Sequence, residues 1–152
     1  MSGINWSRVL LGGLAAGVVM NVFDALVNGM MLGPMWEAET NALNSSLLAR
    51  VATTSMVGWI VFDFCMGIAL VWIYASIRPR YGPGFATALR AGFAVWAISH
   101  LAFASLAFMG LYSSTLVLYS TLGGMASAIA GAYVGGMLYR EEGAPVGARV
   151  VA

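Results

Sequence analysis

The chain has 152 residues, of which 61% are apolar and only 9% are charged, whereas about 25% of the residues in an average soluble domain are charged. This composition excludes a soluble globular domain. The basic residues are all arginine, and the net charge of +1 argues against a polyanion-binding surface, so no nucleic-acid partner is expected.

Four predominantly apolar runs determine the expected fold. Crossing the hydrocarbon core of a bilayer takes about 20 apolar residues in a helix. The runs that are long enough cover residues 9–32, 54–77, 85–111 and 116–139, and each ends at arginine, proline or turn residues. Because a backbone in lipid must satisfy its own hydrogen bonds, each run is predicted to be a helix. The predicted fold class is all-α: a polytopic membrane protein with four transmembrane helices.

The same runs define the domain organisation. We expect one four-helix transmembrane domain over residues 1–140 and a flexible tail over 141–152. The first run follows Arg8, as the apolar region of a signal peptide would, but it continues to Leu32 and is therefore expected to be a retained span. All four prolines lie outside the runs, where they break no helix.

The connections between the runs differ in length. Only residues 112–115 separate the last two runs, so those helices are predicted to be antiparallel neighbours. The longest connection covers residues 33–53 and is predicted to be an outer loop. Its apolar residues are able to form a short helix at the membrane interface: Trp36, Leu43, Leu47 and Leu48.

The arginines predict the orientation of the chain, because positively charged flanks stay in the cytoplasm. In a four-span arrangement only Arg50 lies on the outer side, together with Glu37 and Glu39. The other arginines share the opposite side: Arg8, Arg78, Arg80, Arg90, Arg140 and Arg149. Both termini are therefore expected in the cytoplasm, with the lipid bilayer as the surrounding partner.

Three ionisable residues lie inside the predicted spans: Asp24, Asp63 and His100. Such groups are the default functional candidates, since a charged residue at the centre of a helix costs about 2.5–3.5 kcal/mol on insertion scales. Counted from the cytoplasmic boundary, all three lie at roughly 22–24 Å along their helices. Asn21 and Asn28 share a helical face with Asp24. These five residues are predicted to form an intramembrane polar cluster near the midplane.

Two interpretations of this cluster stay open. In the functional one, the carboxylates share a proton or hold a cation, and His100 accepts the proton or supplies the countercharge. In the structural one, each aspartate only holds one helix against another through hydrogen bonds.

Metal and cofactor sites have little support in the sequence. Two carboxylates, an imidazole and an amide suit a divalent ion, but no HExxH or Glu-x-x-His motif supplies two ligands from one helix. Haem ligation would rest on His100 alone, with Met66 or Met125 as a distant second ligand. We therefore expect no metal, no cofactor and no catalytic residues.

Small residues indicate where helices approach one another closely. In membranes, Gly and Ala faces allow close backbone contact. The glycines predicted to pack helices are Gly13, Gly17, Gly67, Gly124, Gly131 and Gly135. They suggest further contacts with copies of the chain or with a larger membrane complex.

Residues 4–10 (INWSRVL), the glycine-rich span that follows and residues 32–36 (LGPMW) resemble a family of small four-helix bacterial membrane proteins of unknown function. The resemblance covers the first helix with its outer loop, and also residues 122–136. It implies four spans and a bacterial inner membrane, and supplies no catalytic residues. Arginine without any lysine, together with abundant Ala and Gly, is typical of a high-GC bacterial genome.

Three functions follow as hypotheses. The leading one is a non-enzymatic accessory or assembly subunit that packs through its Gly/Ala-rich faces, with the polar cluster fixing the packing. The second is a proton- or cation-coupled carrier acting as an oligomer, motivated by the shared height of Asp24, Asp63 and His100. The third is a cofactor-binding membrane redox protein.

Overall fold

The computed structural model describes residues 3–141, without the side chains of residues 48, 49 and 51–55. Its elements are α1 (Trp6–Asp24), η1 (Ala25–Met31), α2 (Gly33–Leu43), α3 (Ser45–Tyr81), α4 (Phe85–Phe108) and α5 (Ser114–Leu138), with no strand among the described residues. The stretches long and apolar enough to cross a membrane are Trp6–Met31, Met56–Tyr81, Phe85–Phe108 and Ser114–Leu138. The prediction of an all-α, multi-pass membrane protein is confirmed.

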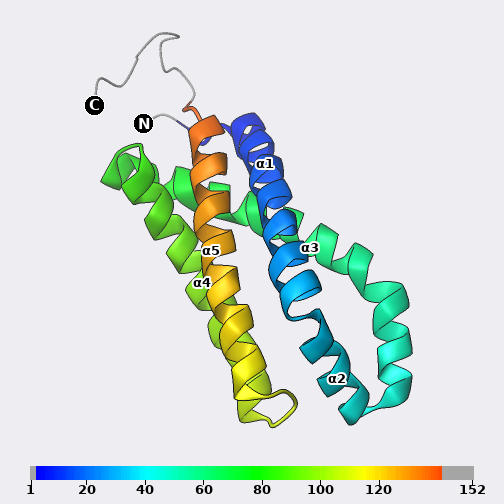
Figure 1. Ribbon diagram of the computed structural model, residues 1–152. Helices are drawn as coiled ribbons and strands as arrows, with labels where there is room; N and C mark the ends of the chain where they lie inside the picture. Colours follow the sequence, from blue (N-terminus) through cyan, green and yellow to red (C-terminus); the bar gives the residue numbers. More distant parts are fainter. Residues whose placement is uncertain (1–2, 142–152) are drawn as a thin grey trace.

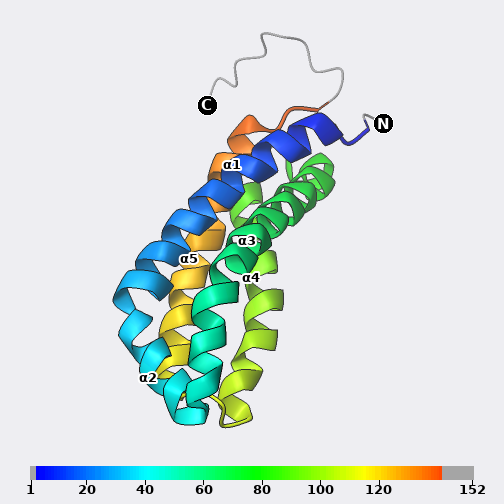
Figure 2. The same cartoon turned by 90° about the vertical axis from the view of Figure 1, so that its right-hand side faces the viewer.

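The helices form one elongated bundle with the two ends of the chain at the same end of it (Figure 1). α1 packs mainly against α3 and α5, and α5 also packs against α4. α4 and α5 are antiparallel neighbours, as the short connection between them predicts. α3 is inclined to the other helices and passes behind α1 and α5 to meet α4 (Figures 1 and 2).

Glycines set the distance between the helices. A Cβ atom on Gly67 of α3 would lie 2.5 Å from the carbonyl oxygen of Gly13 and 2.6 Å from the amide nitrogen of Gly17, both in α1. A Cβ on Gly12 would likewise lie 2.6 Å from the carbonyl oxygen of Gly135 in α5. Since these neighbours are backbone atoms, only glycine permits this spacing of α1 from α3 and α5.

The outer connection contains more helix than predicted. Residues 33–43 form α2, which has Pro34 in its first turn, where a missing amide is tolerated. After Asn44, whose side chain accepts a hydrogen bond from the Ser46 amide (2.9 Å), α3 begins at once. The expectation of a loop over 33–53 is therefore wrong, because this cap starts α3 well before its apolar run.

Pro79 was expected outside the helices, but it lies inside α3. It lies within the last turn of α3, which ends two residues later at Tyr81. Proline removes one backbone hydrogen bond and disturbs the turn before it. Because only two residues of α3 follow Pro79, little of the helix lies beyond this disturbance.

The first span changes its pitch halfway. Beyond Asp24 the helix widens into the π-helical segment η1, and the Leu32 amide donates to the carbonyl oxygen of Val27, five residues earlier (2.8 Å). π-Helical turns inside α-helices are rare and frequently lie at functional sites.

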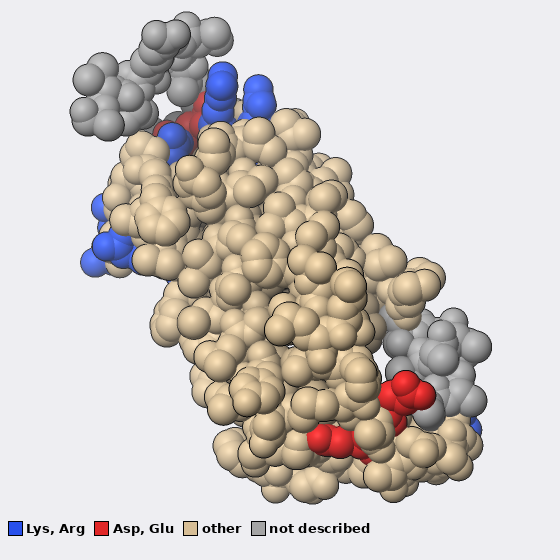
Figure 3. Space-filling model, viewed as in Figure 1, with Lys and Arg blue, Asp and Glu red and all other residues tan. Residues whose placement is uncertain are grey.

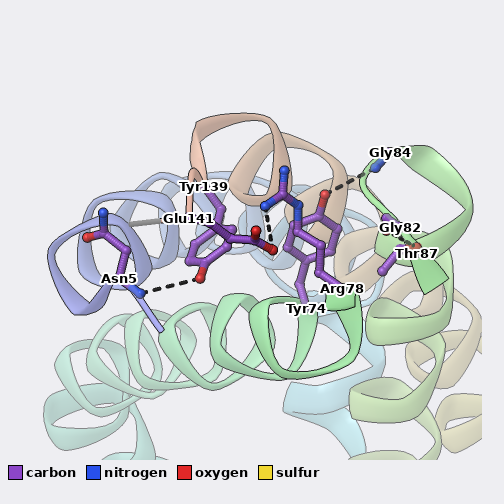
Figure 4. A network of polar contacts seen from close by, with 8 residues as sticks. All are labelled: Asn5, Tyr74, Arg78, Gly82, Gly84, Thr87, Tyr139 and Glu141. Atoms are coloured by element: carbon purple, nitrogen blue, oxygen red, sulfur yellow. Dashed lines mark hydrogen bonds and ion pairs between the residues drawn. The ribbon is translucent and has the colours of Figure 1, made fainter. Parts of the chain in front are cut away.

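The charged side chains gather at the two ends of the bundle, and uncharged residues cover the middle of the face drawn in Figure 3. At the arginine-rich end, a polar network joins the helix ends (Figure 4). Arg78 forms an ion pair with Glu141 (2.8 Å), and the Gly84 amide donates to the Tyr74 hydroxyl (3.2 Å). The Asn5 amide donates to the Tyr139 hydroxyl (3.4 Å). At this end, side chains of α3 and of residues 139–141, which follow α5, therefore contact each other and the segments before α1 and α4.

Candidate functional site

The two intramembrane aspartates occupy neighbouring helices. Asp24 ends α1, directly before η1, and is half-buried. Asp63 lies in α3 and is only 3% exposed. The two helices that carry them, α1 and α3, pack directly against each other. We call these two residues the acid pair.

Asp63 has no hydrogen bond or ion pair with any residue in the described part of the chain. An ionised carboxylate without a countercharge or hydrogen-bond donor is expensive in an apolar medium. Such a group takes up a proton or acquires a cation. Asp63 is therefore the residue whose protonation state matters most for what the site does.

A polar track leads from Asp24 towards the outer end of the bundle. Asn28 donates from its Nδ2 to the Asp24 Oδ1 (3.4 Å). Its Oδ1 accepts hydrogen bonds from Ser120 Oγ of α5 (2.9 Å) and from Trp36 Nε1 of α2 (3.3 Å). Because Asn28 lies in η1, the π-helical segment joins Asp24 to both helices.

The track continues at the end of α2. The Trp36 ring packs edge-on against Tyr112, with 4.9 Å between the centroids, and the Tyr112 hydroxyl lies 3.2 Å from Thr40 Oγ1. The carboxylate of Glu39 accepts from the Ser113 amide (2.6 Å) and from the Ser113 hydroxyl (2.5 Å). A cavity of about 330 Å³ opens beside these contacts, between the end of α2 and the turn before α5, and Glu39, Tyr112 and Ser113 help to line it.

The packing on the arginine side of the acid pair is apolar and dense. Leu70 and Val71, which follow Asp63 in α3, are fully buried. Gly67 lies against the α1 backbone without room for a methyl group. The acid pair therefore has polar neighbours towards the outer end and an apolar barrier towards the other end.

The two aspartates do not lie at the same height in the bundle. Their equal distances from the cytoplasmic boundary, counted along the sequence, had predicted that they would. Phe64, next to Asp63, packs against Gly17, and Gly17 lies seven residues before Asp24. Counting residues assumed helices parallel to the membrane normal, whereas α3 is inclined to α1 (Figure 1). The acid pair is consequently staggered by more than one helical turn along α1.

His100 is not brought to the acid pair. Its Nδ1 lies 3.2 Å from the Trp96 carbonyl oxygen and 3.1 Å from Ser99 Oγ, and its Nε2 packs against Gly124 of α5. His100 therefore lies at the contact between α4 and α5. Among residues 3–141, no group of three or more His, Cys, Asp or Glu side chains is placed to hold a metal ion.

Asn21 also takes a different role from the one expected. Its Nδ2 donates to the carbonyl oxygens of Gly17 (2.9 Å) and of Ile60 in α3 (3.3 Å). It joins α1 to the backbone of α3 instead of binding a carboxylate. Of the five predicted cluster residues, Asn28 is hydrogen-bonded to Asp24, whereas Asn21 bonds the α3 backbone one turn before Asp63. His100 lies apart from them, against Gly124 of α5.

The predicted packing glycines all lie against helices of the same chain. Gly13 and Gly17 meet α3, Gly67 meets α1, and Gly124 meets His100 of α4. Gly131 and Gly135 lie against α1, and Gly135 also lies against Val71 of α3. These six glycines are therefore used for packing inside the bundle.

Several residues of the track were not predicted from the sequence. Ser113 carried a usable signal, because a serine directly before an apolar run is typical of a helix N-cap. Trp36 and Ser120 carried no such signal. Their shared partner Asn28 lies 8 residues from Trp36 and 92 residues from Ser120 along the chain. Only the packing of η1 between α2 and α5 brings them together.

No family model, curated protein or solved structure matches this chain.

Proposed function

We propose that this small integral membrane protein moves protons across the membrane through its acid pair, as a proton-coupled carrier. The observation that carries the proposal is Asp63, an acidic residue that is 3% exposed, lies within a span and has no hydrogen-bond or ion-pair partner in the described part of the chain. A carboxyl group in such surroundings is stable when it holds a proton. Asp24, the other carboxyl group within the spans, would exchange this proton with the outer end.

The surroundings of the acid pair support directed access. Asn28, Trp36 and Ser120 provide hydrogen-bonding groups between Asp24 and the outer end, where the cavity beside Glu39 opens. The buried side chains of Leu70 and Val71 separate Asp63 from the opposite end. This arrangement is expected of a carrier whose proton site is accessible from the outer side and closed to the opposite side.

The size of the bundle favours a proton over a larger solute as the transported species. A four-helix bundle encloses little more than its own side chains. A metal cation would need several ligands, and the described residues provide no group of three acidic, histidine or cysteine side chains. Any larger solute would have to cross between copies of the chain.

Proteoliposomes test the proposal. The full chain, Asp63→Asn and Asp24→Asn are reconstituted at equal density, a membrane potential is imposed, and internal acidification is followed with a pH-sensitive dye. We expect flux in the wild type and flux at the level of protein-free liposomes in Asp63→Asn, because an amide does not take up a proton. Asp24→Asn is expected to be strongly slowed.

Glu37→Gln is the matched control, because Glu37 is an exposed acidic residue of α2 outside the polar track. It should retain wild-type flux. Equal flux from the wild type, Asp24→Asn and Asp63→Asn would contradict the proposal.

An accessory or assembly subunit is the second candidate, and one observation favours it. Seven consecutive residues of α3, 56–62, are all exposed, so this part of a span is less covered by the chain than the rest of α3. Among them, Trp59 and Phe62 form an edge-on aromatic pair with 5.7 Å between the centroids. A helix of a second copy or of a larger membrane complex would cover this segment. The particle mass after purification from native membrane tests this, and a monomer that supports proton flux by itself is no accessory subunit.

The place of the protein in the cell is also a proposal. The arginines at the end of the bundle that carries both termini favour a cytoplasmic position for that end. The resemblance of residues 4–10 and 32–36 to small bacterial four-helix proteins favours a bacterial inner membrane. A reporter that is active only in the cytoplasm, fused to the C-terminus, should be active in this orientation and silent in the reverse one.

A further inference from the structure

A second feature lies far from the acid pair, at the corner where α3 turns into α4. Two arginines share one aromatic ring there. The Cζ atom of Arg90 lies 4.8 Å from the centroid of the Tyr81 ring, and that of Arg80 lies 5.7 Å from it. All three side chains are exposed. We call Arg80, Tyr81 and Arg90 the arginine clamp.

Neither arginine of the clamp has an ion pair with the described part of the chain. Glu141, the acidic residue described at this end, pairs with Arg78 (2.8 Å), while Glu37 and Glu39 lie in α2 at the other end. Two guanidinium groups held against one ring repel each other. An anion bound at this corner would reduce this repulsion and accept charge-assisted hydrogen bonds from the arginines.

The start of α4 adds to the positive potential at this corner. Gly84 occupies the N-cap position of this 24-residue helix and provides no side-chain acceptor for the first amides. The uncapped amides and the helix dipole attract negative charge. Arg90 follows in the second turn of the same helix.

The location of the clamp points to a lipid. It joins the ends of two membrane spans, where headgroups lie, and α4 exposes apolar side chains on the turn before Arg90. Phe85 is 56% exposed and Leu89 is 39% exposed. Figure 3 shows basic side chains gathered over this corner of the bundle. An anionic phospholipid provides a phosphate for the arginines and acyl chains for the apolar residues.

We propose that the arginine clamp binds the headgroup phosphate of an anionic phospholipid. Planar guanidinium groups recognise phosphate through paired hydrogen bonds, and basic residues at the ends of spans attract anionic lipids. The proposal does not depend on the acid pair.

Native mass spectrometry of the full chain tests this proposal. The protein is delipidated, and phosphatidylglycerol or phosphatidylcholine is titrated in. The wild type is expected to retain phosphatidylglycerol in preference. Arg80→Gln and Arg90→Gln should each weaken its binding about fivefold, and the double variant about 25-fold. Equal retention of both lipids by the wild type, or wild-type binding by the double variant, would overturn the proposal.

Two further variants separate the clamp from general charge. Arg8→Gln removes an arginine of α1 that is outside the clamp, and Tyr81→Leu removes the ring while the charge stays. The proposal predicts little change for Arg8→Gln and a clear loss for Tyr81→Leu, and the reverse order would contradict it. A large excess of inorganic phosphate should leave the lipid bound, whereas its displacement would identify a soluble phosphate as the occupant.

Discussion

At the scale of single residues, glycine determines how this bundle is packed. Association of helices in lipid depends on close van der Waals contact, because the surrounding acyl chains are as apolar as the side chains. Gly67 meets backbone atoms of both Gly13 and Gly17, so α1 and α3 touch at the main chain. The same contact forms part of the apolar barrier beside Asp63.

Gly67→Ala tests this contact. Its methyl group would lie within 2.6 Å of two α1 backbone atoms that cannot move independently, so α1 and α3 must separate. We expect a loss of about 1–3 kcal/mol in the free energy of unfolding, measured by thermal or denaturant unfolding in detergent. Gly58→Ala in the same helix is the control, since a Cβ there meets nothing within 4 Å, and alanine should stabilise an open helix position by about 0.5–1 kcal/mol. If Gly67→Ala is as stable as Gly58→Ala, the close approach of α1 and α3 is wrong.

At the scale of elements, η1 and α2 are the parts that hydropathy did not predict. Hydropathy identified a long apolar run but carries no information about helical pitch. The run therefore gave no sign that the helix widens after Asp24. α2 was expected only as a possible short helix at the interface, because residues 33–43 mix apolar and polar residues and are too short to form a span. Its position depends on contacts with Tyr112 and Ser113, which are distant in the sequence.

Glu39 holds α2 against the start of α5. Its carboxylate accepts from the amide and the hydroxyl of Ser113, the N-cap residue of α5. A negative charge at this position also interacts favourably with the helix dipole. Glu39→Gln should therefore lower the free energy of unfolding by about 1 kcal/mol, measured by thermal unfolding in detergent. Glu37→Gln, two residues earlier on the exposed side of α2, should leave it unchanged, and equal stability of both variants would show that the contact contributes nothing.

At the scale of the whole molecule, the sequence predicted which segments cross the membrane and which end of the bundle carries the arginines. Both follow from composition along the chain, because apolar length and flanking charge are local properties. The sequence could not predict which polar residues meet. Helical periodicity gives the face of each residue on its own helix, but it does not give the inclination of α3 or the neighbour that each face meets. This is why Asp24 and Asp63 were predicted together with His100, which instead packs against Gly124.

The proposed function requires that Asp63 carries a proton inside the membrane. Infrared spectroscopy of the protein in lipid bilayers at neutral pH measures this directly, because a protonated carboxyl group has its own C=O stretching band. We predict such a band in the wild type and in Glu37→Gln, and its loss in Asp63→Asn. A wild-type spectrum with only ionised carboxylates, or a band that survives unchanged in Asp63→Asn, would contradict the account.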